Sequence, residues 1–397
     1  MRILYLYPVR AFGGASKSLI ELYGKIKSNG VAGTVICPPG KASEQFQRAG
    51  LRTIHTFGLS QFDNTRFGYY RGFRWFILIR EFLLLPFSFL ALLKAKQVKP
   101  GFDLIHVNEA TLLSLGIFAK WFFKLPLVVH VRSVQRSGNH WRTRFFSYLL
   151  RKYADEVICI DDTVRRSLPA DLPCVVIHNG LILASETDVA SSQGHNPITL
   201  GYVGSLLRLK GIYELLEAVR ILALERGLKF KLLIFGENVR NLAGFRACAL
   251  KCMGFCDDVE KDVEDFISRH ALQDVVELRG FAPDVRDIYP LLDVLCFPSH
   301  LNAAGRPVFE AAFFGIPSLV AMDSPLDDAA QHEITALVID QPTPQLIADA
   351  LERLISDDVL RKELGYNARL WAQRYFDMGQ NAEELYRVYT DILKNAK

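Results

Sequence analysis

Between Phe297 and Ala321 the sequence holds residues suited to binding a nucleoside diphosphate. A predicted strand ends at Phe297, and a loop containing Gly305 leads into a helix that we expect to begin near Arg306, where proline follows. Glycine lets a ligand approach the backbone closely, and the free amides at a helix N-terminus attract phosphate. Glu310 follows about one turn later, within reach of a sugar hydroxyl. The pattern predicts a diphosphate cradle with a carboxylate beside it.

The order of these elements resembles the donor-site signature of glycosyltransferases with the GT-B fold, and above all glycosyltransferase family 4 (glycosyl transferases group 1). Glu310 matches the second of the family's two glutamates, and the first, eight positions earlier, falls on Asn302. The family's usual Glu-Gly-Phe-Gly becomes Asn302 to Gly305 and keeps only the last glycine. The resemblance implies that Glu310 binds the ribose or a neighbouring donor hydroxyl and that Asn302 hydrogen-bonds the sugar. It also implies that Gly305 and Arg306 contact the phosphates.

A second glycine-containing loop, Val203 to Gly211, follows another predicted strand. It resembles the family's Val-Gly-Arg-Leu…Lys-Gly element, whose arginine and lysine neutralise the donor diphosphate. Lys210 matches the lysine, while Ser205 stands at the arginine position and Arg208 lies three residues further on as a substitute. A departing diphosphate needs a fixed cation. A lysine at an exposed helix N-terminus is unfavourable unless an anion lies nearby, so we interpret Lys210 as a diphosphate ligand.

The first half of the chain carries two further motifs. Gly13 and Gly14 follow the first predicted strand and resemble the family's loop that touches the diphosphate or the transferred sugar, although a tight turn would also use them. His130 and Arg132 end the strand Leu127–Val131 on one face, since strand side chains alternate. In the family a histidine near this strand end often faces the donor sugar. Either residue is a candidate contact for donor or acceptor, and a buried, satisfied histidine is the alternative.

Short apolar runs alternate with helix-length segments along the chain, which predicts parallel βαβ units that bind ligands at the carboxyl ends of their strands. The predicted strands are Ile3–Tyr7, Thr34–Cys37, Leu104–Val107, Leu127–Val131, Val157–Ile160, Leu200–Val203, Lys231–Phe235, Val275–Leu278, Val294–Phe297 and Ser318–Ala321.

The small, polar stretch Ala190–Pro197 predicts a linker between two domains. We expect residues 1–190 to form an acceptor-side Rossmann-like domain and residues 198–370 a nucleotide-sugar-binding one. Residues 371–397 are expected to be helical, with a break around Phe376 and Asp377. The resemblance implies the GT-B architecture: an α/β chain of two doubly wound domains that face a central cleft, with a C-terminal helix crossing back to the first domain.

The charge is distributed unevenly. The net charge is +4, but residues 1–190 contain 25 Lys and Arg against 13 Asp and Glu, and the remainder contains 22 against 30. Such a basic half favours anionic partners such as lipid headgroups. Two runs in it combine aromatic residues with arginine: Phe67 to Leu93 with Arg66, Arg71 and Arg74, and His140 to Phe146 with Arg142 and Arg144. They suit an interfacial segment, and a core helix beside ordinary surface is the alternative.

Other classes of function are disfavoured. Arg80, Glu81 and Pro86 interrupt the apolar run, which argues against a membrane-spanning helix. No recognised nucleic-acid motif accompanies the basic residues. Glycines at 13 and 14 do not extend to the dinucleotide-binding pattern of a dehydrogenase.

The seven scattered cysteines fit a reducing compartment better than a disulfide framework. Cys248, Cys252 and Cys256 recur every four residues without a fourth ligand at common zinc spacing, so we interpret them as small apolar residues of an inserted helix. The N-terminal apolar run is too short for a secretory signal. We expect a cytoplasmic protein, peripheral on the inner face of the membrane.

The resemblance implies a retaining hexosyltransferase that uses a UDP- or GDP-sugar and a glycan or lipid-linked acceptor, in cell-surface polysaccharide or glycolipid synthesis. Lys210, Glu310, Asn302, His130 and Arg132 are the candidate catalytic residues. No Asp-x-Asp motif is evident, which agrees with charge neutralisation by side chains and helix N-termini, without a metal ion or cofactor. A GT-B sugar-nucleotide epimerase is one alternative. A weakly active donor-binding scaffold is another, suggested by Asn302 and Ser205.

Overall fold

The structure is a computed structural model that describes residues 1–66, 68, 70, 75–138, 140–182, 194–238, 258–282 and 284–395. The chain divides into unit 1, formed by Met1–Ile182 with Phe376–Lys397, and unit 2, formed by Leu183–Tyr375. The unit boundaries therefore fall after residues 182 and 375, beside the boundaries predicted near 190 and 371. The cysteines at 248, 252 and 256, Arg71, Arg74 and part of the predicted linker lie outside the described residues.

Unit 1 is built on a seven-stranded parallel sheet with the strand order β3-β2-β1-β4-β5-β6-β7. The strands are β1 (Arg2–Leu6), β2 (Ala32–Cys37), β3 (Arg52–His55), β4 (Leu104–Val107), β5 (Leu127–Val131), β6 (Glu156–Cys159) and β7 (Val175–Val176). Ile3 and Tyr5 of β1 face one apolar cluster, and Leu4 and Leu6 face another. Because both faces of the sheet are apolar, helices must cover both.

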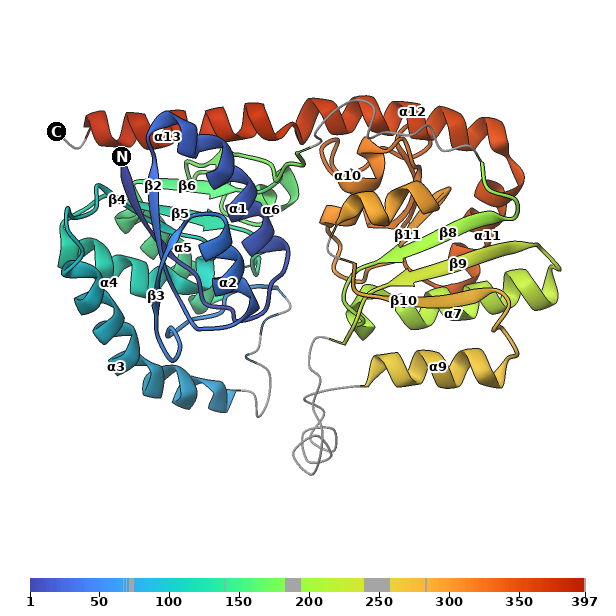
Figure 1. Cartoon of the computed structure of the whole chain (residues 1–397), viewed down its shortest axis with the longest axis horizontal. Coiled ribbons are helices and arrows are strands. Elements are labelled where there is room, and N and C mark those ends of the chain that lie inside the picture. Colours follow the sequence, from blue (N-terminus) through green and yellow to red (C-terminus); the bar gives the residue numbers. More distant parts are fainter. Residues whose placement is uncertain are drawn as a thin grey trace. The chain divides into compact units, whose positions relative to one another are not determined.

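Each face of this sheet has its own set of helices (Figure 1). One face packs against α1 (Gly14–Ile26), α2 (Lys41–Arg48) and α13 (Met378–Asn395). The other packs against α3 (Ile77–Lys96), α4 (Leu113–Phe123), α5 (Trp141–Tyr153) and α6 (Asp162–Arg166). Short 3-10 turns lie at Lys27–Asn29 and Ala110–Leu112.

The last helix, α13, belongs to the first unit. Leu385 and Tyr389 are buried against the sheet, and the Tyr389 hydroxyl lies 2.7 Å from Nδ1 of His106 on β4. A Cβ at Gly180 would lie 2.9 Å from the Cα of Met378, so glycine allows the chain to pass closely there. The predicted C-terminal helix that returns to the first domain is confirmed.

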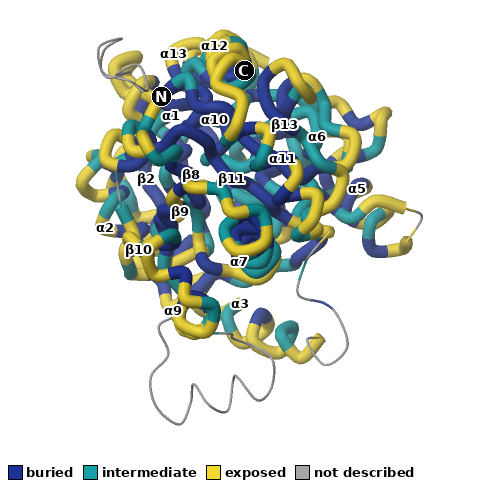
Figure 2. Tube along the Cα trace, turned by 90° about the vertical axis from the view of Figure 1, so that its right-hand side faces the viewer, coloured by how far each residue is buried: buried dark blue, intermediate teal, exposed yellow. Residues whose placement is uncertain are grey.

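Unit 2 has a six-stranded parallel sheet with the order β10-β9-β8-β11-β12-β13. The strands are β8 (Ile198–Val203), β9 (Phe230–Phe235), β10 (Val276–Gly280), β11 (Val294–Phe297), β12 (Ser318–Ala321) and β13 (Ala336–Ile339). The helices are α7 (Ile212–Arg220), which continues as a π turn (Ile221–Glu225), α9 (Val259–Arg269), α10 (Arg306–Phe313), α11 (Pro344–Ser356) and α12 (Asp358–Tyr375). In Figure 2 the strands are largely coloured as buried, whereas α3 and α9 carry exposed stretches.

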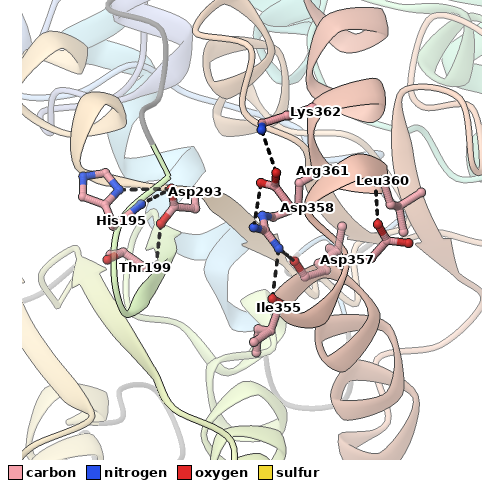
Figure 3. Close-up of polar contacts among 10 residues, drawn as sticks. His195, Thr199, Asp293, Ile355, Asp357, Asp358, Leu360, Arg361 and Lys362 are labelled. Carbon is pink, nitrogen blue, oxygen red and sulfur yellow. Dashed lines mark hydrogen bonds and ion pairs between the residues drawn. The ribbon is translucent and has the colours of Figure 1, made fainter.

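Two polar clusters stabilise unit 2 away from the carboxyl ends of its strands (Figure 3). Asp293 accepts hydrogen bonds at Oδ1 from the backbone N of His195 at 3.1 Å and at Oδ2 from that of Thr199 at 2.7 Å, which ties the start of β8 to the start of β11. Arg361 of α12 donates to the carbonyls of Leu354 and Ile355 at the end of α11. The six strands of unit 2 have the same order as the first six of unit 1, which adds β7 at the edge. The fold class predicted from the sequence, α/β with two doubly wound units, is confirmed.

Candidate functional site

The loops that follow β8 and β11 in unit 2 are locked together by close backbone contact. Gly211 has φ +73°, and a Cβ there would lie 1.8 Å from the carbonyl oxygen of Pro298, so only glycine fits. The backbone N of His300 donates to the carbonyl of Leu209 at 3.0 Å. The structure thus brings the two loops predicted to bind the donor to one place at the carboxyl ends of adjacent strands.

Lys210 lies at the centre of this arrangement. Its side chain is half-buried, and its Nζ lies 5.2 Å from the centre of the Phe297 ring. Burial lowers the pKa of the ammonium group. In the described part of the chain no carboxylate pairs with it. A desolvated cation without a carboxylate creates a place for an anionic ligand.

The Phe297 ring also contacts the start of α10. A Cβ at Gly305 would lie 2.6 Å from Cζ of Phe297, so glycine permits this close packing. Gly305 is the N-cap of α10, and its carbonyl accepts a hydrogen bond from the N of Val308 at 3.0 Å. The predicted helix start is therefore present, and its N-terminus lies on the same ring as Lys210.

Arg306 and Glu310 contact each other within α10. The Nε and Nη2 atoms of Arg306 each lie 3.0 Å from Oε1 of Glu310, and the Tyr289 hydroxyl donates to Oε2 at 3.0 Å. All three side chains are largely buried. The carboxylate thus holds the arginine and the helix in place, and its predicted contact with a donor hydroxyl stays a prediction.

The other predicted donor residues have different surroundings. Asn302 has φ +49°, a conformation that asparagine tolerates better than most residues, and its Oδ1 accepts from the backbone N of Asp323 at 2.7 Å. Ser205 is exposed, and its carbonyl accepts from the Tyr202 hydroxyl at 3.1 Å. Arg208 is exposed above the Tyr213 ring. Neither Ser205 nor Arg208 is desolvated in the way that Lys210 is.

In unit 1, Arg132 is held at the carboxyl ends of the central strands. Its Nη1 donates to Oδ1 of Asn179 at 3.0 Å, and its Nη2 donates to Oδ1 of Asn108 at 2.9 Å. The same Nη2 lies 3.3 Å from Nδ1 of His130, so the predicted shared face is present. Burial, with the charge of Arg132, keeps the pKa of His130 well below its ordinary value, and the imidazole is neutral.

Glu109 is a candidate that the sequence analysis missed. It lies two residues after the end of β4, and burial raises the pKa of its carboxyl to about 7 although the charge of Arg132 opposes the shift. A carboxyl group with a perturbed pKa beside a fixed arginine at a strand end is typical of functional sites. The signal was available, because Asn108 and Glu109 come immediately after a predicted strand.

Gly13, at the start of α1, has no close neighbours on the side where a Cβ would lie. Gly13 is the N-cap of this helix and has an extended backbone that any residue can adopt. Its backbone N donates a hydrogen bond to Oγ of Ser16 at 2.9 Å. A Cβ at Gly13 would meet no atom of the described structure within 4 Å. Gly14 is the first helical residue. Neither crowding nor positive φ requires glycine at position 13, which leaves close approach of a ligand as a reason for it.

The basic–aromatic run of α5 lies partly in the core. Arg142 is buried, with its guanidinium 5.5 Å from the centre of the Tyr70 ring and 5.8 Å from that of Trp75. The guanidinium packs on aromatic rings, so the core alternative holds for Arg142, and the interfacial role of the two runs stays a prediction. Across the described ranges, no group of three or more His, Cys, Asp or Glu side chains is placed to hold a metal ion, and no helix is long and apolar enough to cross a membrane.

Comparison with known proteins assigns both halves of the chain. Residues 12–184 match the family described as Glycosyltransferase Family 4, and residues 185–371 match Glycosyl transferases group 1. The capsular polysaccharide biosynthesis glycosyltransferase CapM of Staphylococcus aureus is 25% identical over 50% of this chain. That alignment spans 47% of CapM, about half of its length. The alpha-D-kanosaminyltransferase of Streptomyces kanamyceticus is 24% identical over 68% of this chain and 71% of its own.

Solved structures with the same fold cover nearly the whole chain. Anabaena Alr3699/HepE, in complex with UDP and glucose, superposes with a TM-score of 0.74 at 18% identity, over 98% of this chain and 99% of that one. The sucrose-phosphate synthase of Thermosynechococcus elongatus has a TM-score of 0.72 at 18% identity, over 99% of both chains. With both units matched in succession from residue 12 to residue 371, this chain belongs to the GT-B glycosyltransferases of the family 4 type, the glycosyl transferases group 1.

Proposed function

We propose that this protein transfers a hexose from a UDP-sugar to a glycan or lipid-linked acceptor, with retention of the anomeric configuration. The observation that carries the proposal is Lys210, a half-buried cation without a carboxylate partner among the described residues, placed against Phe297 beside the start of α10. Charge that develops on a leaving diphosphate is stabilised most by donors and cations already fixed in a desolvated site. The locked loops of unit 2 provide such a site.

Each side chain then has a definite task. Lys210 neutralises the leaving diphosphate, and the first amides of α10 bind its oxygens, so the charge needs no metal ion. Glu310 accepts a hydrogen bond from a hydroxyl of the donor sugar in addition to those from Arg306 and Tyr289, because an ionised carboxylate has about four acceptor positions. Asn302 hydrogen-bonds the sugar through its amide nitrogen, since its oxygen is engaged.

Unit 1 supplies the acceptor side. Arg132 is fixed by Asn108 and Asn179 at the strand ends, and Glu109 lies beside it with a raised pKa. A carboxyl with a pKa near 7 exchanges a proton at physiological pH. We assign to Arg132 and His130 contacts with the donor sugar or the acceptor, and to Glu109 a hydrogen bond to an acceptor hydroxyl.

The choice of substrate rests on related proteins. The HepE structures contain UDP with glucose, UDP alone and UDP-glucose, and CapM is named for capsular polysaccharide biosynthesis. A UDP-sugar donor and a role in cell-surface polysaccharide or glycolipid synthesis follow as proposals. Exposed apolar side chains on α3 and α4 and the basic first half favour peripheral attachment to the anionic inner face of a membrane.

The test begins with donor binding. Thermal unfolding is measured with UDP-glucose, UDP-galactose, UDP-N-acetylglucosamine and GDP-mannose, with and without EDTA, because a ligand of the folded state raises its stability. We expect a rise with a UDP-sugar that survives EDTA and is smaller in Lys210→Ala. Stabilisation by GDP-mannose alone would overturn the choice of base.

The second step follows the label of a radioactive donor sugar. Label in the acceptor supports a transferase, and the anomeric coupling in the product's NMR spectrum reports retention. Conversion of the free donor would instead show an epimerase, and binding without turnover would show a scaffold.

A further inference from the structure

The exposed surface of α3 in unit 1 is largely apolar. Phe76, Ile79, Leu83, Phe87 and Leu90 follow one another at steps of three or four residues, so they form one line along the helix. They are between 43% and 68% exposed. This line of five side chains is called the apolar stripe below.

The buried face of α3 carries two polar side chains, Glu81 and Ser88, beside the core residues Ala91, Leu92 and Ala95. Ser88 Oγ accepts from the N of Ser60 at 2.9 Å, and Glu81 Oε2 accepts from the N of Gln61 at 2.8 Å. A helix on a protein surface ordinarily turns its polar side outward. The polar groups of α3 are used to hold the chain that precedes it, and its exposed side is left to contact something apolar.

One turn beyond the apolar stripe, α3 carries a cation that lines a pocket. Lys94 follows Leu90 by four residues and lines a cavity of about 360 Å³ together with Phe87, Leu90, Arg10, His55 and Phe57. The Nη2 of Arg10 donates to the carbonyl of Phe57 at 2.8 Å, and its guanidinium lies 5.5 Å from the centre of that ring. Within the described ranges neither Arg10 nor Lys94 has a carboxylate partner. The pocket therefore combines two cations with apolar walls.

The pocket suits an anionic group, and the apolar stripe suits a hydrocarbon chain. At a rise of about 1.5 Å per residue, the helix from Phe76 to Lys94 is about 27 Å long, the scale of an extended hydrocarbon chain. A free anion would use the cations but not the stripe, and an apolar chain would use the stripe but not the cations. One amphiphilic anion uses both.

We propose that the pocket and the apolar stripe form one binding site for a lipid phosphate. The phosphate lies between Arg10 and Lys94, and the hydrocarbon chain lies along the stripe. The inference rests on the proposed function, because the lipid is then the carrier of the acceptor. Arg10 belongs to the loop between β1 and Gly13, so the headgroup is held beside the loop predicted to approach the transferred sugar.

The test measures binding to vesicles. Phosphatidylcholine vesicles with and without dioleoyl phosphatidic acid are co-sedimented with the wild-type protein and three double variants. Arg10→Gln with Lys94→Gln removes the pocket's cations, and Leu83→Ser with Leu90→Ser interrupts the stripe. Lys25→Gln with Arg48→Gln is the matched control, because it removes the same charge from exposed positions of α1 and α2.

We expect the pocket variant to bind phosphatidic acid vesicles about thirtyfold more weakly, since each basic residue near a lipid surface contributes roughly a fivefold effect. The control should lose less than about threefold, as expected for distant charges that salt screens. The stripe variant should lose binding to both kinds of vesicle. Equal losses in the pocket variant and the control would overturn the site, and so would failure of the wild-type protein to bind.

Two further arms separate the alternatives. If inorganic phosphate stabilises the protein against unfolding as strongly as dihexanoyl phosphatidic acid does, the pocket is a free-phosphate site and the lipid proposal fails. If sedimentation without lipid shows a dimer that the stripe variant disperses, the stripe is a protein interface and the proposal also fails.

Donor binding, followed by thermal shift with the UDP-sugar, is measured on every variant. Lipid binding without donor binding or transfer would defeat only the proposed function. Donor transfer to a soluble glycan without lipid binding would defeat only this inference.

Discussion

The first six strands of unit 1 have the same order as the six strands of unit 2, yet the two chains differ between the third strand in sequence and the fourth. In unit 1 the chain from β3 to β4 contains the 20-residue helix α3 with its apolar stripe. In unit 2 the described residues between β10 and β11 form two 3-10 turns, Val285–Asp287 and Tyr289–Leu291, and no α-helix. The added helix places Ala91, Leu92 and Ala95 in the core and also exposes the apolar stripe. The comparison teaches that two sheets with closely similar strand orders differ most in the segment that gives unit 1 its exposed apolar surface.

The glycine loops show the same contrast. Gly211 of unit 2 is fixed by positive φ and by the carbonyl of Pro298, and a Cβ at Gly236 would lie 2.0 Å from the carbonyl of Gly204. Gly13 of unit 1 has open space around it. Tight backbone contact in unit 2 preorganises a site for one kind of ligand, whereas the open loop of unit 1 accommodates a variable one.

The largest effect is expected in unit 2. Lys210→Ala should lower turnover by on the order of a hundredfold or more, because the leaving diphosphate loses its fixed cation, and the fold should remain intact. Steady-state kinetics with the UDP-sugar measure the effect, and Lys229→Ala, an exposed lysine before β9, serves as the control. Near-normal turnover in a folded Lys210→Ala protein would remove this residue from the mechanism.

The glycine contrast is tested by a pair of substitutions. Gly211→Ala should destabilise unit 2 by about 2–3 kcal/mol, because alanine is strained at this φ and its Cβ would overlap Pro298. Gly13→Ala should change stability by less than about 1 kcal/mol. Urea unfolding measures both. If the Gly13→Ala protein keeps its stability but no longer transfers the sugar, Gly13 serves ligand binding. Equal destabilisation by the two substitutions would contradict the proposed difference between the two loops.

Glu310 tests whether one carboxylate serves both the helix and the donor. Glu310→Gln should weaken donor affinity or turnover by about 1.5–3 kcal/mol, the scale of a hydrogen bond to a charged group. It should also lower the stability of unit 2, because buried Arg306 loses its counter-ion. Tyr289→Phe, which removes only the hydroxyl donated to Glu310, is the comparison. Lost stability with unchanged donor affinity and turnover would restrict Glu310 to a structural role.

The smallest effect concerns the pH response of unit 1. Burial lowers the pKa of His106 from 6.5 to about 3, so the folded state binds its proton less tightly than the unfolded state. Stability from this group is present above pH 6.5 and is lost as the pH falls toward 3. Relative to His106→Gln, the wild-type protein should lose about 1 kcal/mol more between pH 6.5 and 5.5.

Urea unfolding of both proteins at each pH measures this difference. The comparison is needed because Glu109 acts in the opposite direction: its raised pKa adds stability as the pH falls from 7 toward 4.5. Parallel pH profiles for the wild-type protein and His106→Gln would show that His106 does not contribute.

Much of the fold was predictable because parallel strands buried on both faces appear as continuous apolar runs. All ten predicted strands are present, with bounds that agree within two residues. The missed strands are β3, which is polar and only partly buried, β7, which has two residues, and the edge strand β13. An edge strand or a very short one offers little pattern to detect.

The site was predictable where chemistry depends on neighbours in sequence. Lys210 and Gly305 are in their predicted loops, and the structure brings them to the same Phe297 ring. Contacts between segments that are distant in sequence could not be predicted from local motifs. The hydrogen-bond partners of Arg132, for example, lie 24 and 47 residues away from it. The positive φ of Asn302 and the burial of Arg142 likewise depend on tertiary packing rather than on a local pattern.

The return of α13 to unit 1 has a consequence for synthesis on the ribosome. Leu385 and Tyr389 cover a sheet face that is otherwise formed from β1 and its neighbours near the N-terminus. Although α1 and α2 cover part of that face early, the part beneath α13 stays open until this helix has been made. Unit 2 has all of its residues by Tyr375 and can close earlier. Folding here runs against the usual N-to-C order of domains, and the nascent first unit is the one that needs protection from aggregation.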